Sequence, residues 1–322
     1  MRPVDEHAAE LAAGAWAQLE APGSERPPLY RSILLAHAEA LENPIHVAAL
    51  WRGDGALGGL AIAIQNADAR RPALIIGIPN SLRSRHPTGL WVAPGPDGQA
   101  VAHRLLVALR ELAQQLGIAR LVLGFCPGGW DQERAADEAG LGAMIAQSQY
   151  ELSLPPGGHA AYLAGLGHKR RQDALRDFRA CERAGATCTE EVSPTDELLE
   201  RAWAMQLDTY TRHRVGTYAW RQNLFLALRQ RLPTSLSMTV CRRDGSLLGY
   251  ILSHRAGHET MAVYSGRAAT ADFPVHMALM ATVAKVEAER GPTRLLLGPT
   301  NDVLKRRMGA TEVPHVHFYS RS

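Results

Sequence analysis

The sequence predicts an α/β (α+β) protein made of two similar domains, each a mixed sheet with flanking helices, joined by a basic helix. A chain of 322 residues is long enough for two domains of ordinary size. Two stretches of the first half recur in the second half, in the same order. Two matches in one order are typical of an internal duplication.

The first repeated stretch predicts a β-hairpin. The segment WRGDGALGGLAI, from Trp51, aligns with CRRDGSLLGYIL, from Cys241. Each copy places Asp-Gly between two apolar runs, and this dipeptide tolerates the positive φ of a tight turn. The alignment also matches Gly59 with Gly249.

The second repeated stretch predicts a long helix followed by a short buried strand. The segment VAHRLLVALRELAQQLGIARLVLG, from Val101, aligns with VHMALMATVAKVEAERGPTRLLLG, from Val275. Apolar residues recur with helical spacing up to a glycine that ends the helix. We expect further strands at 73–79, 259–266, 144–154 and 313–319, and further helices at 8–19, 29–41 and 195–231.

Composition excludes several classes of protein. The formal net charge is only +3, so an anionic partner requires a local basic cluster. The four cysteines form no CxxC pair and have no histidine at metal spacing, so neither a disulfide framework nor a metal site is expected. No apolar run reaches the roughly 18 residues of a membrane helix. With a poor signal peptide as well, we expect a cytoplasmic protein without a membrane partner.

A local basic cluster does occur, in GHKRRQDALRDFRACERAG from Gly167 to Gly185. Its cations are Lys169, Arg170, Arg171, Arg176, Arg179 and Arg183. In a helix several of them share one side, opposite an apolar stripe. Such a side could contact a phosphate backbone, or it could be a solvated helix face with intrahelical ion pairs.

This arrangement resembles the tandem form of the GCN5-related N-acetyltransferase (GNAT) fold, in the branch of CelD-like and Fem-type aminoacyl-tRNA-dependent transferases. The resemblance is carried by the basic run His168–Arg171 and by LLLGPTNDVLKRRMGA, with Gly298, Lys305 and Gly309 in place. Met308 replaces the usual aromatic residue of that motif. The similarity covers most of residues 150–322 and, more weakly, the first half.

The resemblance implies a GNAT-like domain at 1–154, a linker with the basic helix at 155–185, and a second GNAT-like domain with the active cleft at 186–322. The first domain is expected to be a degenerate copy. A usual member cradles the pyrophosphate of coenzyme A on a glycine-rich loop at a helix start. The corresponding segment here, AATADFPVHMALM, has no glycine, and the glycines of the first half are wrongly spaced.

The implied activity is amide formation, by transfer of an acyl or aminoacyl group to an amine of a small molecule or precursor. Because the chain lacks the usual coenzyme A loop and has a basic helix, aminoacyl-tRNA is the favoured donor. Acyl-CoA is the alternative donor. No tightly bound cofactor is expected. A third alternative is a module that binds tRNA or a small molecule without catalysis. The oligomeric state stays open.

The resemblance also implies roles for single residues. Tyr264 and Ser265 could protonate the leaving group, and Lys305 could stabilise charge on the transferred carbonyl. The residues expected to bind the donor or its phosphate are Arg267, His276 and the six cations of the basic helix. The expected acceptor-binding residues are Tyr210, Arg212, His213 and Asn301.

Each of these roles has a plainer alternative. Tyr264 could be a core aromatic residue with a satisfied hydroxyl group. Lys305 could be a surface lysine at the start of a short helix. His276, just inside a helix that begins after proline, could pack or cap rather than bind. Sequence alone leaves these alternatives open.

Overall fold

A computed structural model describes most of the chain. The described residues are 44–53, 55–66, 72–76, 89–93, 95–127, 133–145, 148–213, 223–291, 293–299 and 301–320, with scattered positions between 33 and 42. The expected helix at 8–19 lies outside them, and the one at 29–41 lies only partly within them. The described chain forms two compact units, of residues 1–147 with 314–322 and of residues 148–313.

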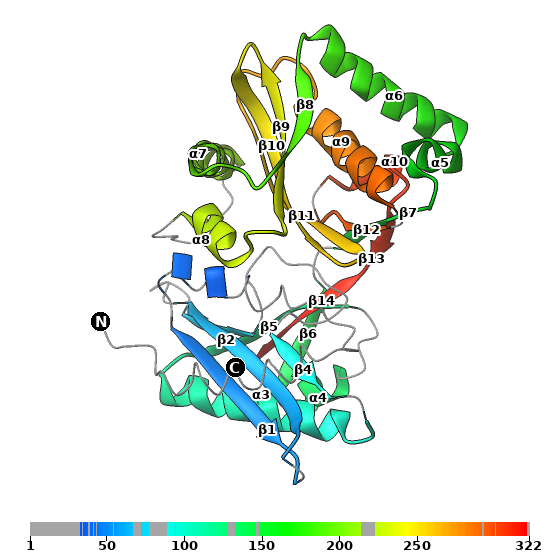
Figure 1. The fold of residues 1–322 in the computed structure, drawn as a ribbon. Coiled ribbons are helices and arrows are strands. Elements are labelled where there is room, and N and C mark those ends of the chain that lie inside the picture. Colours follow the sequence, from blue (N-terminus) through cyan, green and yellow to red (C-terminus); the bar gives the residue numbers. More distant parts are fainter. Residues whose placement is uncertain are drawn as a thin grey trace. The chain divides into compact units, whose positions relative to one another are not determined.

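The first unit contains one mixed sheet with two helices among its described elements (Figure 1). Its elements are β1 (Ile45–Trp51), β2 (Leu57–Asn66), β3 (Ala73–Ile76), β4 (Leu90–Val92), α3 (Gly98–Gln115), β5 (Arg120–Pro127), α4 (Glu133–Glu138), β6 (Leu141–Ile145) and β14 (His315–Ser320). The strand order is β1-β2-β3-β5-β14-β6, and β4 pairs with β2. Only β3 and β5 run parallel; the other pairs are antiparallel.

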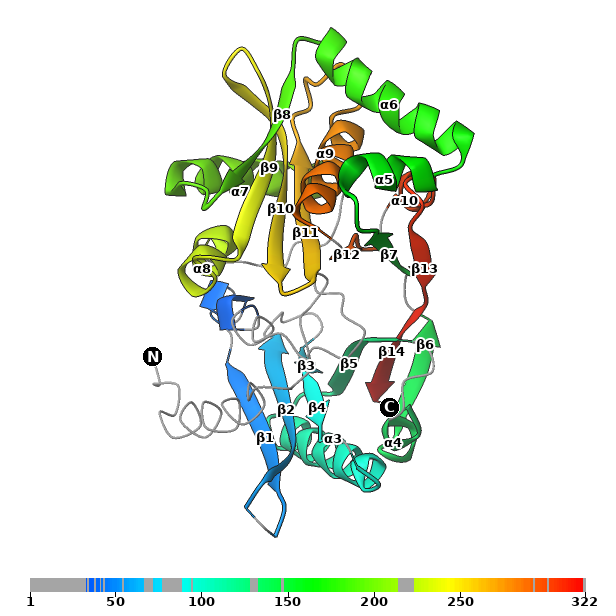
Figure 2. The same ribbon diagram turned by 45° about the vertical axis from the view of Figure 1, so that its right-hand side comes forward.

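The second unit repeats this plan with more helices (Figure 2). Its strands are β7 (Gln149–Leu154), β8 (Thr187–Val192), β9 (Leu236–Arg243), β10 (Ser246–Ala256), β11 (Glu259–Arg267), β12 (Thr293–Leu296) and β13 (Thr311–Val313). Its helices are α5 (Gly158–Gly165), α6 (His168–Arg183), α7 (Asp196–His213), α8 (Leu224–Arg231), α9 (Val275–Arg290) and α10 (Asp302–Arg307). The strand order is β13-β7-β12-β11-β10-β9-β8. The predicted fold class, two mixed sheets with flanking helices, is confirmed.

Equivalent glycines explain how each long helix packs on its sheet. A Cβ atom added to Gly59 would lie 2.5 Å from Val101 Cγ1 and 3.0 Å from Leu105 Cδ1. A Cβ atom added to Gly249 would lie 2.7 Å from Val275 Cγ1 and 3.2 Å from Leu279 Cδ1. These are the residues that the sequence repeat aligns with one another. The long helix therefore approaches the second strand of the hairpin at the same place in both units.

The two halves of the chain exchange one strand. In the first unit β14, from the end of the chain, lies between β5 and β6. In the second unit β7, which follows directly on the first half, takes the equivalent place between β12 and β13. The strands predicted at 144–154 and 313–319 are therefore each divided between the two units. Pro314, which has no N–H to give to a ladder, stands at the second division.

The exchange changes the domain boundaries relative to those expected from the sequence. The predicted second domain, 186–322, includes β14, which pairs in the first unit's sheet. The predicted linker, 155–185, forms α5 and α6, which pack on the second unit. Tyr162 and Leu166 lie in the same core cluster as Val275 and Leu279 of α9, and the Tyr162 hydroxyl donates to the Met308 carbonyl at 3.0 Å. Apolar residues of this segment are buried, which a free linker would leave in water.

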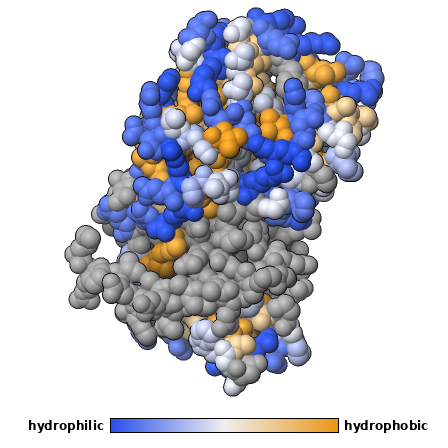
Figure 3. All heavy atoms as spheres, viewed as in Figure 1, coloured by the Kyte–Doolittle hydropathy of each residue, from blue (hydrophilic) through white to orange (hydrophobic). Residues whose placement is uncertain are grey.

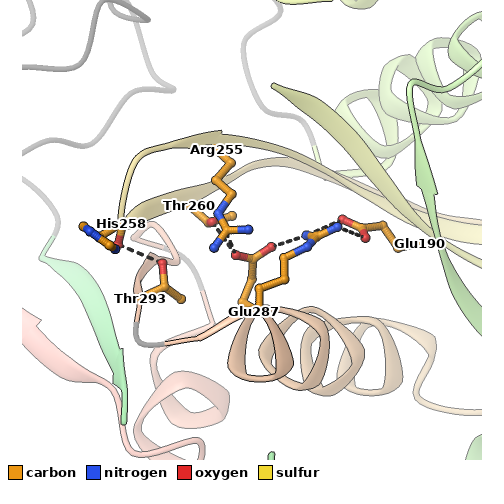
Figure 4. A network of polar contacts seen from close by, with 7 residues as sticks. Glu190, Arg255, His258, Thr260, Glu287 and Thr293 are labelled. Atoms are coloured by element: carbon orange, nitrogen blue, oxygen red, sulfur yellow. Dashed lines mark hydrogen bonds and ion pairs between the residues drawn. The ribbon is translucent and has the colours of Figure 1, made fainter. Parts of the chain in front are cut away.

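A polar network fixes the C-terminal half of α9 (Figure 4). Glu287 is buried, with 2% of its surface exposed. Its carboxylate accepts hydrogen bonds from Thr260 Oγ1 of β11 at 2.6 Å and from Arg290 Nη1 at 2.7 Å. Arg255 of β10 lies 3.8 Å away, and Arg290 also pairs with Glu190 of β8. The network thus connects α9 with three strands of its sheet.

Candidate functional site

The candidate site lies where β11 and β12 separate. These parallel strands pair only from Glu259 to Met261 with Arg294 to Leu296. Beyond that point β11 continues to Arg267, and among the described strands it pairs there only with β10. The chain after β12 stays beside β7, since the Leu297 N–H donates to the Tyr150 carbonyl at 2.9 Å and continues the pairing of these two strands. One backbone edge of β11 therefore faces the opening between the two strands.

Side chains alternate across this part of β11. Tyr264 and Gly266 face the side of α7 and α8. The Tyr264 ring centroid lies 5.2 Å from that of Phe225, and a Cβ atom added to Gly266 would meet Tyr250 and Met205. Tyr264 is 4% exposed and belongs to the core, so its role as a proton donor stays a prediction.

Ser265 and Arg267 face the opposite side of the sheet, toward α9. Ser265 is half-buried and Arg267 is exposed. His276, in the first turn of α9, is half-buried. Burial, with the positive charges of Lys305 and Arg267, lowers the pKa of His276 to about 4. The tertiary structure thus brings Arg267, His276 and Lys305 close enough to interact electrostatically.

Lys305 is a buried cation. It is 2% exposed, its ammonium group donates to the Gly298 carbonyl at 2.6 Å, and Nζ lies 5.5 Å from the centre of the Tyr150 ring. Gly298 follows β12 with φ of 83°, a conformation that suits glycine. Lys305 is therefore held near the end of β12, and the alternative of a surface lysine is wrong.

Two of the expected acceptor-binding residues lie near the end of β11. Arg212, in the last turn of α7, donates to the Arg267 carbonyl at 2.7 Å and pairs with Asp208 at 2.8 Å. Tyr210 is half-buried and close enough to raise the pKa of Tyr250, whose shift comes mainly from burial. The side chain of His213 lies outside the described residues.

Asn301, the last expected acceptor-binding residue, is exposed. It precedes α10 in a left-handed conformation, with φ of 59°. Its backbone carbonyl accepts from the Lys305 N–H at 3.2 Å and so starts the helix that carries Lys305.

The loop before α9 lacks the features of a pyrophosphate cradle. It has no glycine, and Asp272 places a carboxylate there, which pairs with Arg243 at 2.9 Å. A carboxylate at the position of the cradle would repel a phosphate group bound beside it. In the first turn of α9, the N–H groups of Val275 and Met277 donate to the Phe273 and Pro274 carbonyls at 2.8 and 3.0 Å, and both side chains are apolar.

The basic residues of 169–183 all lie on α6. Lys169, Arg170, Arg176, Arg179 and Arg183 are exposed, and Arg171 is half-buried. Asp173 pairs with Arg176 at 2.9 Å and with Arg307 of α10 at 3.4 Å, which neutralises part of the positive charge. In Figure 3 hydrophilic residues line the outer edge of the region where Figure 1 places α6.

The structure also reveals a cluster that the sequence concealed. Cys181 of α6, Cys188 of β8 and Cys241 of β9 place their sulfur atoms within 4.8 Å of one another. Only the pairing of β8 with β9 and the turn after α6 bring them together. The sequence spacing gave no signal for it.

Comparison with known proteins relates this geometry to a family. Residues 168–306 match the model of the acetyltransferase (GNAT) domain. In sequence, no curated protein matches the chain. None of the described helices is long and apolar enough to cross a membrane.

Solved structures match almost the whole chain. FemX has a TM-score of 0.61 at 13% identity, covering 100% of this chain and 96% of its own. A tandem GNAT protein from the clavulanic acid biosynthesis pathway has a TM-score of 0.59 at 15% identity, covering 98% and 95%. A C-terminal domain from Agrobacterium fabrum, described as that of a lysylphosphatidylglycerol synthetase, has a TM-score of 0.61 at 11% identity, covering 96% and 93%. At these identities the likeness establishes the fold, and the expected tandem, Fem-like GNAT fold is confirmed.

Proposed function

We propose that this chain, which carries a GNAT acetyltransferase domain at residues 168–306 within a tandem GNAT fold, is a transferase that forms an amide from an amine and an acyl or aminoacyl donor. The observation that carries the proposal is the edge of β11 that pairs with no described strand beyond Met261, with Arg267, His276 and Lys305 near it. The family match supports this class of reaction, and the geometry supports this location for it.

The chemistry requires orientation, charge stabilisation and removal of a proton. The neutral amine attacks the donor carbonyl, a C–N bond forms, and the bond to the leaving oxygen or sulfur breaks. The proton that the amine loses ends on that leaving atom, which departs as a hydroxyl or thiol group. Backbone N–H groups along the edge of β11 are suited to polarise that carbonyl. With its pKa lowered to about 4, His276 is neutral near pH 7 and can accept a hydrogen bond from the amine. Arg267 and Lys305 supply positive charge for the leaving group.

For the donor we favour aminoacyl-tRNA. The loop before α9 lacks glycine and carries Asp272, which disfavours a pyrophosphate there. Lys169, Arg179 and Arg183 are exposed on α6, where a phosphate backbone can reach them. Among the structural neighbours, the domain from Agrobacterium fabrum is named for a lysylated product.

Acyl-CoA is the alternative donor. It is favoured by the neighbour from the clavulanic acid pathway, whose description mentions acetyl-CoA. The pairing of Asp173 with Arg176 and Arg307 also removes part of the positive charge on α6. In either case the acceptor is an amine of a small molecule or precursor.

Equilibrium binding of unfractionated tRNA, at about 50 and about 200 mM salt with coenzyme A as competitor, separates the two donors. The test variant carries Lys169→Glu, Arg176→Glu and Arg183→Glu. A matched control reverses three exposed arginines elsewhere, Arg104, Arg134 and Arg201. A plot of the logarithm of the binding constant against the logarithm of the salt concentration has a negative slope. The loss of three phosphate contacts should make this slope less steep by about 2 to 3.

The outcomes point in different directions. Salt-sensitive tRNA binding that only the α6 variant loses supports aminoacyl-tRNA as the donor. Equal loss in both triple variants means general electrostatic attraction, and it would remove α6 from the proposal. Coenzyme A binding without tRNA binding assigns acyl-CoA as the donor and makes α6 a solvated face.

A further inference from the structure

The three clustered cysteines come from three different elements of the second unit, and only Cys241 is far from the other two in sequence. Cys181 lies in the last turn of α6, Cys188 on β8 and Cys241 on β9. Figure 2 shows α6 running into β8, which lies beside β9. Cys181 and Cys241 are buried, and Cys188 is half-buried.

The turn after α6 brings the first two cysteines together. The Ala186 N–H donates to the Cys181 carbonyl at 3.1 Å, and the Gly185 N–H donates to the Glu182 carbonyl at 2.9 Å. With Gly185 at φ of 64°, this is a Schellman motif, which reverses the chain directly after the helix. The strand that follows carries Cys188 back past the last turn, and its sulfur lies 3.7 Å from that of Cys181.

Sheet register adds the third sulfur atom. Cys188 and Cys241 are direct partners in the antiparallel pairing of β8 with β9. Direct partners project their side chains to the same face of a sheet. That face is also covered by α6, because Cys188 packs against the core cluster that contains Cys181 of α6 and Cys241.

The spacing of the sulfur atoms suits a metal ion. Zinc–sulfur bonds of about 2.3 Å in a tetrahedral site place neighbouring sulfurs ~3.8 Å apart. The Cys181 and Cys188 sulfurs are 3.7 Å apart, and all three lie within 4.8 Å of one another. Among the described histidines, cysteines and acidic residues, no fourth joins this group. Three sulfurs without oxygen or nitrogen ligands form a soft donor set.

We propose that Cys181, Cys188 and Cys241 bind one thiophilic d¹⁰ metal ion, Cu(I) or Zn(II), as thiolates. Cu(I) is satisfied by three sulfur ligands. Zn(II) requires a fourth ligand, which water can supply from the exposed side of Cys188. Each thiol loses its proton to the solvent as the metal binds. The bound ion would hold the end of α6 to β8 and β9. This inference is independent of the proposed transferase activity.

The test is metal titration of the full chain, stripped of metal with a chelator and kept reduced under anaerobic conditions. Cu(I) is titrated against a colorimetric chelator. Zn(II) affinity is measured by competition, and Co(II) serves as its spectroscopic substitute. We expect one bound ion per chain, an ultraviolet absorption band from thiolate-to-metal charge transfer, and a higher melting temperature of the protein when the metal is bound. Strong absorption typical of tetrahedral Co(II) would mean that the site offers four ligands and suits Zn(II). Tight binding of Cu(I) without binding of Zn(II) or Co(II) would mean that it offers three.

Two variants decide whether these cysteines are the ligands. Cys188→Ser changes the half-buried cysteine of the three. It should weaken metal binding by more than about 100-fold, which is the largest loss expected for a residue that only supports a ligand without contacting the metal. Cys126→Ala, at the buried cysteine of the first unit, is the matched control and should bind as the wild type does. If Cys188→Ser does not fold, Cys188→Ala takes its place. Absence of stoichiometric binding, or equal binding by the Cys188 and Cys126 variants, would overturn the proposal.

Discussion

The hydroxyl group of Thr260 donates a hydrogen bond of 2.6 Å to the buried carboxylate of Glu287. Thr260 is the middle of the three β11 residues that pair with β12, and Glu287 lies on α9. The bond therefore fixes the long helix at the level where the two strands begin to separate. Because the helix also carries His276, this contact helps to set the geometry of the opening.

Replacing Glu287 with alanine should lower the free energy of unfolding by about 3 kcal/mol, because a buried, paired charge is removed. Thr260, Arg290 and Arg255 would lose their shared partner. Denaturant unfolding measures the change, and Glu200→Ala, at an exposed position of α7, is the control. A loss no greater than that of the control would mean that the network contributes little.

Gly249→Ala should destabilise the second unit by about 1–3 kcal/mol, the range for overpacking. The new methyl group would lie 2.7 Å from Val275 Cγ1 and 3.0 Å from the Gly266 carbonyl oxygen. The helix can move away only by shifting His276 relative to β11, so transferase activity should fall as well. Gly165→Ala has open space around its Cβ and should be neutral or slightly stabilising. Similar unfolding curves for the two variants would contradict the close packing.

Stability should fall with acid through buried His254. This residue is 1% exposed, its ring nitrogens have no hydrogen-bond partner among the described residues, and burial lowers its pKa to about 3. The folded state therefore binds its proton less readily than the unfolded state, whose histidine pKa is about 6.5. The contribution of neutral His254 to the free energy of unfolding is fully present above pH 6.5. It is lost as the pH falls from 6.5 toward 3, by about 1.4 kcal/mol per pH unit.

His254→Leu should remove this slope, as measured by denaturant unfolding at several pH values between about 4 and 7. His168→Leu changes an exposed histidine of α6 and should keep it. Because carboxylates titrate in both variants, the comparison isolates the contribution of His254. Parallel pH profiles for the two variants would show that His254 does not titrate differently on folding.

Lys305→Met should lower the turnover number by roughly 100-fold, the loss found when one stabilising donor is removed from a transition state. The methionine keeps most of the stem beside Tyr150 and removes the ammonium group that donates to Gly298. Steady-state kinetics with the donor that binds, combined with unfolding curves, separates catalysis from stability. Lys285→Met, at an exposed position of α9, is the control. A higher KM with an unchanged turnover number would instead assign Lys305 to donor binding.

The sequence by itself determined the repeating plan of the protein. Apolar periodicity and the Asp-Gly turn depend on neighbours in the chain, so the hairpin β9–β10 and the helices α3 and α9 could be located in advance. The matched glycines, Gly59 and Gly249, indicated duplication, and both prove to lie under their long helices. The expectation that α6 is a basic helix also follows from local pattern alone.

Only the tertiary structure decided which strand joins which sheet. β7 and β14 have patterns that fit either sheet, and their exchange is fixed by pairing with strands more than a hundred residues away. The same holds for Arg267, His276 and Lys305, and for Cys181, Cys188 and Cys241. Local sequence specifies the conformation of a segment, whereas register and packing between distant segments determine which side chains meet.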